Sequence, residues 1–205
     1  MKKNLYTRLT EDNGSWWIHK IDNFTMSCYQ LYSTTLMRII SFFRGVSIDV
    51  GCRFFGLTHF RRFPSSTIHV GKDCVFRSDQ TSNLIGVNHP CILSTHFEKS
   101  EIRIGDHCGF SGVTIGAARE IRIGNNVLCG ANCVITDFDW HLDLRNTPPA
   151  PVIIHDNVWI GLNTVILKGV EIGANSVIGA NSLVVHNIPS NVIAAGNPCK
   201  VIKAR

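Results

Sequence analysis

The sequence predicts an all-β protein in which short strands stack as a solenoid, and three observations support this prediction. An aliphatic residue returns at every sixth position near the end of the chain. Glycine follows it at Gly161, Gly173 and Gly179, and a small or β-branched residue such as Thr164 or Ser176 stands four places after it. The aliphatic positions are Ile154, Ile160, Ile166, Ile172, Ile178 and Val184.

A six-residue step does not suit a helix. An α-helix turns about 100° per residue, so this step spreads the aliphatic side chains over three directions and forms no single apolar face. Each unit is also too short to bury its own aliphatic residue, so the units must stack on one another. Three units form one coil of the left-handed parallel β-helix that this pattern resembles, and each coil is expected to rise about 4.8 Å.

The same register is present upstream, which extends the predicted solenoid over residues 46–189. Turn glycines such as Gly105 and Gly124 follow the upstream positions in the expected place. Residues 190–205 are expected to form a C-terminal tail. The upstream positions are Val70, Phe76, Ile104, Phe110, Ile123, Cys129 and Ile135.

The N-terminal region, residues 1–45, is predicted to contain a capping helix. Apolar residues recur at spacings of three and four between Tyr29 and Phe43, and Gly45 follows as a helix C-cap would. The helix is expected to cover the open strand edge at the start of the solenoid, because exposed strand edges invite aggregation. Contact with a membrane surface, aided by Arg38 and Arg44, is the alternative.

Composition favours a single domain. The chain has 205 residues, of which 44% are hydrophobic and 17% charged, and this suits one core rather than two. Residues 1–80 carry 11 Lys and Arg against 6 Asp and Glu, so the net charge of +5 lies in that part of the chain. This charge fits a solvated face, an anionic substrate or a membrane surface. Without a nucleic-acid motif, nucleic-acid binding is not expected.

A cytoplasmic location is expected for the protein. Polar residues follow the basic start where the apolar run of a signal peptide would stand, and no transmembrane span is expected. Cys74, Cys108, Cys129 and Cys133 fall at core or inward positions of the repeat, where they act as small apolar residues. The eight cysteines are therefore expected to stay reduced and to bind no metal.

The repeat is interrupted once, over residues 136–152. This insertion is too long to stay within a coil, so it must project as a loop, stiffened at its end by Pro148, Pro149 and Pro151. The loop begins Asp137-Phe138-Asp139-Trp140-His141. Projecting loops on a rigid scaffold often carry functional residues.

At these residues the chain resembles the hexapeptide-repeat O-acetyltransferases, which include galactoside and maltose acetyltransferases and enzymes that modify surface polysaccharides. The resemblance covers most of residues 46–205. Its most specific parts are the loop 137–141, the run Asn157-Val158-Trp159-Ile160-Gly161 and the ending Ala195-Gly196-Asn197-Pro198-Cys199-Lys200-Val201-Ile202. It implies a homotrimer with active sites between subunits, acetyl-CoA as the acyl donor and a hydroxyl group as the acceptor.

The resemblance also implies roles for loop residues. His141 matches the catalytic histidine, a general base that takes the proton of the attacking hydroxyl. Asp139 and Asp137 are the candidates to orient its imidazole, and either aspartate could instead hold the backbone of the loop. The oxyanion is expected to accept a hydrogen bond from the amide of Gly161 or Leu162.

Donor and acceptor contacts are assigned in the same way. Cations of the last coil are expected to meet the phosphates of acetyl-CoA, and other residues to line a groove for its pantetheine arm. A sugar acceptor is expected to meet Ser111 and Asp137, and a sugar on an anionic carrier in polysaccharide biosynthesis would fit the basic first part of the chain. The donor candidates are Trp159, Gly161, Leu162, Ala180, His186, Lys200 and Lys203.

Two other functions share this type of scaffold. A γ-type carbonic anhydrase needs three histidines that converge on zinc, and His107, His155 and His186 occupy different places in their repeats. A non-catalytic scaffold protein would keep the repeat but has no need for a histidine on a projecting loop. The acetyltransferase is therefore the prediction, with the scaffold protein as the alternative.

Overall fold

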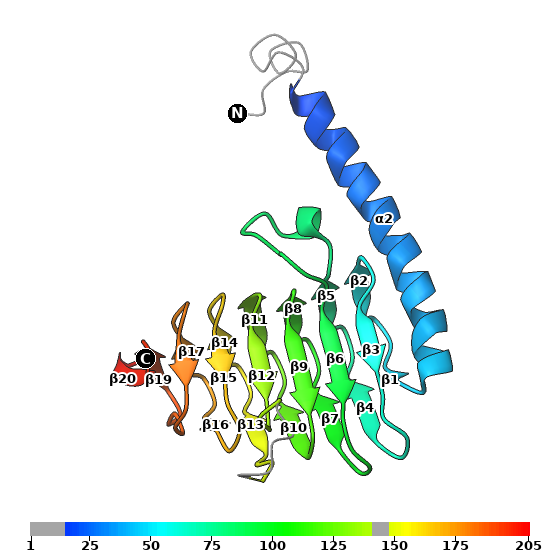
Figure 1. The fold of residues 1–205 in the computed structure, drawn as a ribbon. Helices are drawn as coiled ribbons and strands as arrows, with labels where there is room; N and C mark the ends of the chain where they lie inside the picture. The colour runs from blue at the N-terminus through cyan, green and yellow to red at the C-terminus, as the bar shows by residue number, and fades with distance from the viewer. Residues whose placement is uncertain (1–14, 141–147) are drawn as a thin grey trace.

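A computed structural model of the protein describes residues 15–140 and 148–205. One long helix, α2 (Ser15–Arg44), leads into a solenoid of short strands that form three sheets (Figure 1). Sheet A contains β1 (Ser47–Ile48), β4 (Thr67–Val70), β7 (Glu101–Ile104), β10 (Glu120–Ile123), β13 (Val152–Ile154) and β16 (Glu171–Ile172).

The other two sheets complete the coils. Sheet B contains β2 (Arg53–Phe55), β5 (Val75–Arg77), β8 (Gly109–Ser111), β11 (Leu128–Ala131), β14 (Trp159–Ile160), β17 (Val177–Ile178), β19 (Val192–Ala195) and β20 (Lys200–Ala204). Sheet C contains β3 (His59–Arg61), β6 (Ile92–Thr95), β9 (Thr114–Ala117), β12 (Val134–Thr136), β15 (Val165–Ile166) and β18 (Leu183–Val184). A 3₁₀ turn, η1 (Gln80–Ser82), lies in an insertion between β5 and β6.

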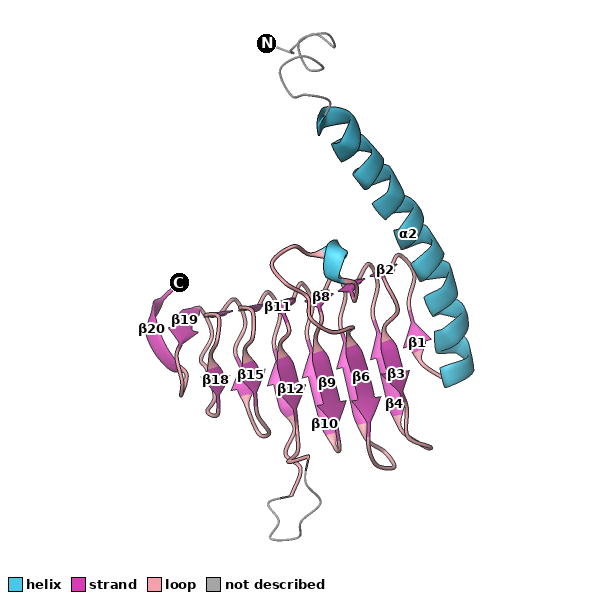
Figure 2. Ribbon diagram, turned by 45° about the horizontal axis from the view of Figure 1, so that its top comes forward, coloured by secondary structure: helices cyan, strands magenta, loops and turns pink. Residues whose placement is uncertain are grey.

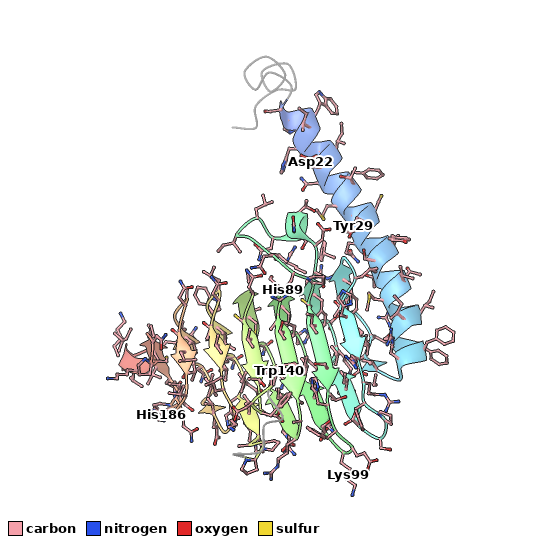
Figure 3. The ribbon with its side chains drawn as sticks, in the orientation of Figure 1. Asp22, Tyr29, His89, Lys99, Trp140 and His186 are labelled. Carbon is pink, nitrogen blue, oxygen red and sulfur yellow. The ribbon has the colours of Figure 1, made fainter. Side chains whose placement is uncertain are left out.

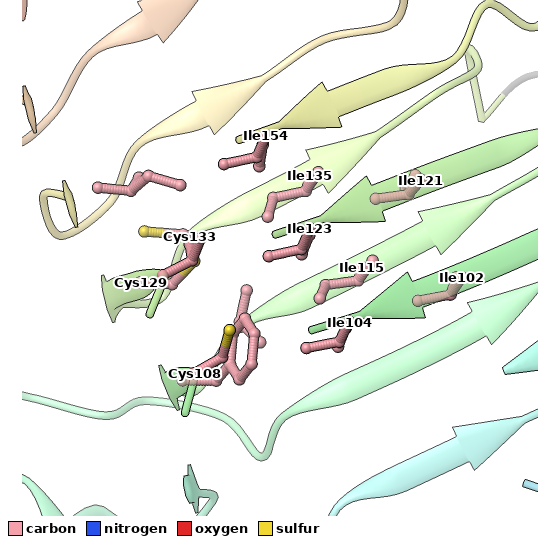
Figure 4. Close-up of a cluster of buried hydrophobic side chains, with 14 of the residues drawn as sticks. Ile102, Ile104, Cys108, Ile115, Ile121, Ile123, Cys129, Cys133, Ile135 and Ile154 are labelled. Atoms are coloured by element: carbon pink, nitrogen blue, oxygen red, sulfur yellow. The ribbon is translucent and has the colours of Figure 1, made fainter. Parts of the chain in front are cut away.

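The chain passes from sheet A to B to C and back, so consecutive strands meet at three corners, which we name A/B, B/C and C/A. Neighbouring coils pair in parallel and in register, with Ile104, Ile123 and Ile154 on adjacent strands. Figure 4 shows these isoleucines stacked inside the solenoid. All six aliphatic positions of the predicted repeat are buried. The left-handed parallel β-helix predicted from the sequence is confirmed.

Asparagines explain how the corners repeat. Asn157, Asn175 and Asn191 adopt positive φ angles of 59° to 60° at the A/B corner. Asparagine tolerates this left-handed conformation better than most residues. Each side-chain amide also donates to the next, at 3.1 Å from Asn157 to Asn175 and at 3.0 Å from Asn175 to Asn191. Local backbone preference and stacking between coils therefore favour the same turn.

The core changes composition along the solenoid. In the first coils, Phe54, Phe76 and Phe110 stack with centroid separations of 5.0 and 5.1 Å, whereas aliphatic residues fill the later coils. All eight cysteines are free thiols, and seven of them are buried. Burial raises the pKa of the Cys133 thiol to about 11, so this thiol is protonated and unreactive at neutral pH.

Helix α2 covers the open edge of the first coil, as expected, but it is longer than predicted. It begins at Ser15 rather than near Tyr29, because no glycine or proline interrupts the chain between Gly14 and Gly45. Its hydroxyl groups bind the free edge of β2. The N–H of Phe54 donates to Thr34 Oγ1 at 3.0 Å, and the N–H of Gly56 donates to Ser33 Oγ at 3.2 Å.

The C-terminal end is also covered. Residues 190–205, expected as a tail, instead contain β19, which extends sheet B, and β20, which folds back antiparallel on it. The final residue is tied down as well, since Arg205 Nη1 donates to the carbonyl of Asn175 at 2.9 Å. No helix within the described residues is long and apolar enough to cross a membrane.

Candidate functional site

Two adjoining hollows lie along the outer face of sheet B. The corner hollow, of about 390 Å³, lies against the B/C corner and contains Gly161, Leu162 and Ala180. The face hollow, of about 410 Å³, lies against the earlier coils and contains Ser111. The insertion between β5 and β6, which stands above the sheets in Figure 2, contributes to both. Because the hollows share Asn83, Gly130 and Trp159, they form one groove.

Glycines give the corner hollow its shape. A Cβ atom on Gly161 would lie 2.4 Å from the backbone nitrogen of Ala180, and one on Gly130 would lie 2.6 Å from that of Leu162. The N–H groups of Leu162 and Ala180 have no hydrogen-bond acceptor among the described residues. The glycines therefore leave two unpaired backbone donors exposed beside the groove.

One predicted role is corrected by this geometry. The amide of Gly161 donates to the carbonyl of Ile178 at 2.8 Å within the stacked coils, so it is not available to an oxyanion. Of the two amides proposed from the sequence, Leu162 is the one left unpaired. Sequence reasoning missed this because it cannot tell which N–H groups the next coil uses.

The last coil places both predicted lysines opposite residues that neighbour the corner hollow. Lys200 pairs with Ala195, and a Cβ atom on Gly179 would lie 2.7 Å from that of Ala195. Lys203 pairs with Ile193, next to Val177 of the hollow. His186 follows β18 toward the C/A corner and does not line the hollow (Figure 3). The structure therefore separates His186 from the other donor candidates within one chain.

The face hollow is polar at one end and apolar at the other. Arg53 and Arg77 project from β2 and β5, and Leu128 and Trp159 project from β11 and β14. Ser111 is 6% exposed, and its Oγ accepts a hydrogen bond from Asn83 Nδ2 at 3.1 Å. Sequence reasoning missed the arginines, because their proximity depends on the stacking of two coils.

The projecting loop is anchored by Asp137 at the C/A corner. This carboxylate is fully buried and accepts hydrogen bonds from the N–H groups of Ala118 at 2.6 Å, Arg119 at 2.7 Å and Glu120 at 2.5 Å. Burial raises its pKa, and these hydrogen bonds oppose the shift. The carbonyl of Asp137 also accepts from the N–H of Ala150 at 2.9 Å, which ties the two ends of the loop together.

The predicted role of Asp137 in acceptor binding does not agree with this position. A fully buried carboxylate with three backbone donors is not exposed to a sugar. Asp139 is more exposed, and its Oδ2 accepts a hydrogen bond from Lys168 Nζ at 2.5 Å. His141 lies outside the described residues, so its contacts with either aspartate stay a prediction.

An aromatic cluster that the sequence did not reveal packs beside this anchor. The ring of His96 lies 4.9 Å from that of Phe138 and 4.8 Å from that of Trp140. Burial, with a smaller effect from Arg61, lowers the pKa of His96. Trp140 covers Gly116, where a Cβ atom would lie 2.5 Å from the indole. The cluster therefore holds the described start of the loop against sheet C.

The loop and the groove stand at different corners of one chain. The loop leaves β12 at the C/A corner, whereas Gly161 and Ala180 lie at the B/C corner. Sheet C separates them, a distance of about 15 to 20 Å for one six-residue unit.

Histidines do not converge within the described part of the chain. His107 and His155 follow sheet A at the A/B corner, and His186 approaches the C/A corner. His107 lies 3.7 Å from Asp73, and His155 lies 2.7 Å from Glu171. Among residues 15–140 and 148–205, no group of three His, Cys, Asp or Glu side chains is placed to hold a metal ion.

Comparison with known proteins identifies relatives of this chain. The model of the bacterial transferase hexapeptide family (six repeats) matches residues 151–186. Galactoside O-acetyltransferase of Escherichia coli strain K12 is 48% identical over 96 residues, which cover 44% of this chain and 47% of that protein. Galactoside O-acetyltransferase of Lactococcus lactis subsp. lactis is 36% identical over 137 residues, which cover 64% of this chain and 60% of that protein.

A solved structure has the same fold. A mutant of AntD, an N-acyltransferase from Bacillus cereus in complex with dTDP and coenzyme A, aligns with a TM-score of 0.55 and 18% identity. The alignment covers 78% of this chain and 83% of that one. The resemblance to hexapeptide-repeat acetyltransferases is confirmed. The chain spans about half to three fifths of the length of the two galactoside O-acetyltransferases.

Proposed function

We propose that this chain, whose residues 151–186 belong to the bacterial transferase hexapeptide family, transfers an acetyl group from acetyl-CoA to a hydroxyl of a sugar or glycan precursor. The observation that carries the proposal is the strip of glycines exposing the N–H groups of Leu162 and Ala180. The pantetheine arm of coenzyme A is a narrow chain with amide carbonyls, which suits backbone donors beside a groove without side chains. The two similar galactoside O-acetyltransferases support this reaction class.

In the proposed reaction, His141 takes the proton of the acceptor hydroxyl as its oxygen attacks the thioester carbon. A new C–O bond forms, and the carbonyl electrons move to oxygen, where the N–H of Leu162 stabilises the negative charge. The carbonyl then re-forms, the C–S bond breaks, and the leaving thiolate receives the proton from His141. We retain Asp139 as the group that orients His141, and we leave out Asp137 because its carboxylate already accepts three backbone hydrogen bonds.

The active site is proposed to lie between copies of the chain in a cyclic trimer. Within one chain, sheet C separates the C/A corner, where the chain leaves β12, from the corner hollow. A neighbouring copy can bring its C/A corner to this B/C corner, so that each site takes its base from one subunit and its donor groove from the next. Light scattering that finds the active species at the 22.8 kDa mass of one chain would contradict this arrangement.

A sugar acceptor is proposed because the groove continues past Trp159 to polar groups, including Asn83 and the neighbouring Ser111. Polysaccharide biosynthesis and a cytoplasmic location stay predictions. A non-catalytic scaffold protein is less favoured, because it has no use for unpaired amides beside a groove. An acetyl-CoA thiol-release assay with a panel of sugars tests the function. We expect release that depends on both acetyl-CoA and a sugar, and a protein that binds neither would be a scaffold.

Peripheral membrane contact is a second proposal, and it is carried by the outer face of α2. The buried residues of this helix, Ser33, Met37 and Ser41, lie on one side, and a stripe of exposed apolar side chains runs along the other. Lys20 and Arg38 flank the stripe, which suits an anionic lipid surface. The stripe contains Trp17, Ile18, Ile21, Phe24, Leu31, Tyr32, Ile39, Phe42 and Phe43.

Vesicle sedimentation tests this contact. The protein should bind vesicles that contain phosphatidylserine more strongly than vesicles of phosphatidylcholine alone. Replacing Phe24 and Phe42 by serine should reduce binding about tenfold or more, because each ring contributes buried apolar area. Leu57→Ser, at an exposed leucine outside the helix, is the matched control. Self-association through the helix with no affinity for either vesicle would show that a second copy covers the stripe instead.

A further inference from the structure

The face hollow has a charge distribution that the acetyl-transfer reaction does not explain. Arg53 and Arg77 extend from adjacent strands of sheet B into this hollow. Of the described residues that line it, Asp73 is the acidic one, and it lies 3.7 Å from His107 at the A/B corner. The end of the hollow that contains the two arginines is therefore basic, and Asp73 faces His107 instead of an arginine.

The two arginines differ in how they are held. Arg77 Nη1 donates to the carbonyl of Ser82 at 2.5 Å, and its guanidinium carbon lies 4.7 Å from the centre of the Phe55 ring. Arg53 is exposed, and its side chain forms no hydrogen bond or ion pair with the residues that the structure describes. One guanidinium is thus fixed in place, while the other is available to a ligand.

The like charges also affect each other. Burial, with a smaller contribution from the nearby Arg53, lowers the pKa of Arg77. An anion placed between the two guanidinium groups would relieve this repulsion. Arginine binds phosphate and carboxylate groups through paired N–H donors, so both groups are suitable ligands.

The rest of the hollow suits a sugar attached to such an anion. Asn83 and Ser111 supply polar groups, and the exposed rings and methyl groups of Trp159 and Leu128 supply an apolar wall. A sugar ring presents an apolar face as well as hydroxyl groups. The volume of about 410 Å³ is within the range of small-molecule sites.

We propose that the face hollow binds an acidic sugar, one that carries a phosphate or carboxylate group, with Arg53 and Arg77 holding the anion. This inference rests on the proposed function for its orientation: the donor lies along the later coils and the acceptor along the earlier ones. The two meet at Trp159, Gly130 and Asn83, which both hollows share. The arginines then determine specificity for the acceptor and take no part in the chemistry.

Isothermal titration of the full chain tests the site without any reaction. The probes are glucose 1-phosphate, glucuronate, neutral glucose and coenzyme A. We expect at least one acidic sugar to bind about tenfold or more tightly than glucose, since hydrogen bonds to a charged group are stronger than those between neutral groups. The tighter of the two acidic sugars identifies the preferred anion, phosphate or carboxylate.

Two variants complete the design. Arg53→Gln should weaken binding of the acidic sugar about tenfold while leaving glucose and coenzyme A unchanged. Arg122→Gln, at an exposed strand position of sheet A, removes the same charge elsewhere and should change nothing. Equal binding of acidic and neutral sugars would overturn the proposal. If Arg53→Gln loses only its binding of coenzyme A and binds the sugars as before, the face hollow belongs to the donor. The binding measurements do not depend on acetyl transfer. The proposed acetyltransferase activity and the proposed binding of an acidic sugar can therefore fail independently of each other.

Discussion

The two corners that flank sheet C are built in opposite ways. At the B/C corner, glycines of consecutive coils leave the N–H groups of Leu162 and Ala180 exposed. At the C/A corner, the buried carboxylate of Asp137 uses three backbone N–H groups to hold the loop. One corner leaves backbone donors for a ligand, whereas the other satisfies its donors internally. The difference indicates that the regular repeat can supply a binding surface, whereas a projecting loop needs its own anchor.

The largest expected effect is at the anchor. Asp137→Ala should lower the free energy of unfolding by about 3 kcal/mol or more, because three backbone N–H groups lose a buried, charged acceptor. Chemical denaturation monitored by circular dichroism measures this loss. Asp139→Ala, at the exposed neighbouring aspartate, is the matched control and should cost much less stability. Equal losses would show that Asp137 is not the anchor.

The next effect concerns the residue that the anchored loop carries. His141→Ala should leave the fold intact and reduce the rate of acetyl transfer about a hundredfold or more, as expected for loss of a positioned general base. Steady-state kinetics at saturating acetyl-CoA and acceptor measure this change. His155→Ala, at an exposed histidine of the A/B corner, is the matched control and should have little effect. A near-normal kcat in His141→Ala would contradict the assignment of His141 as the general base.

A smaller effect is expected beyond the B/C corner, in the last coil. Replacing Lys200 and Lys203 together by alanine should raise the KM for acetyl-CoA by the equivalent of about 1 to 2 kcal/mol, because exposed charges are screened by solvent. The acceptor KM should stay unchanged, and donor binding should depend less on salt. The matched control removes two exposed charges elsewhere, at Lys99 and Arg122. If only the acceptor KM rises, the donor and acceptor ends of the groove are reversed.

The smallest effect is a pH dependence at the C/A corner. Because burial lowers the pKa of His96, the unfolded chain, with a value near 6.5, takes up the proton first as the pH falls. The contribution of the neutral His96 side chain to the free energy of unfolding is therefore complete above pH 6.5 and declines below that pH. His96→Phe should show a smaller drop in Tm between pH 7.5 and pH 5.5 than the unchanged protein does. Identical drops would mean that His96 titrates alike in both states.

The repeat made the scaffold predictable from sequence. Each sixth residue from Ile154 to Val184 reports one buried strand position, so periodicity alone locates the sheets and the stacked core. The cap was predicted too, but not its length, because residues 15–28 contain fewer apolar repeats than residues 29–43. The C-terminal strands were missed because β19 and β20 do not follow the six-residue step.

The candidate site was less predictable, because its features depend on contacts between coils. The sequence indicates glycine at 161 but not that its amide is already bonded to Ile178. It identifies Asp137 in a loop motif but not its burial beneath the turn at Ala118. Arg53 and Arg77 line one hollow from two adjacent strands, and this proximity leaves no local pattern in the sequence. Motif spacing thus locates candidate residues, whereas stacking decides which atoms remain free.

Subunit complementation tests most directly the claim that the two corners form one site between copies. Ala180→Trp should block the corner hollow, and His141→Ala should remove the base, so each variant alone should be inactive. When the two are mixed and reassembled, about a quarter of the sites in a cyclic trimer combine an intact loop from one subunit with an intact groove from the next. We expect recovery of activity to about that fraction. Mixed trimers, verified by native mass spectrometry, that stay as inactive as either variant would contradict the account.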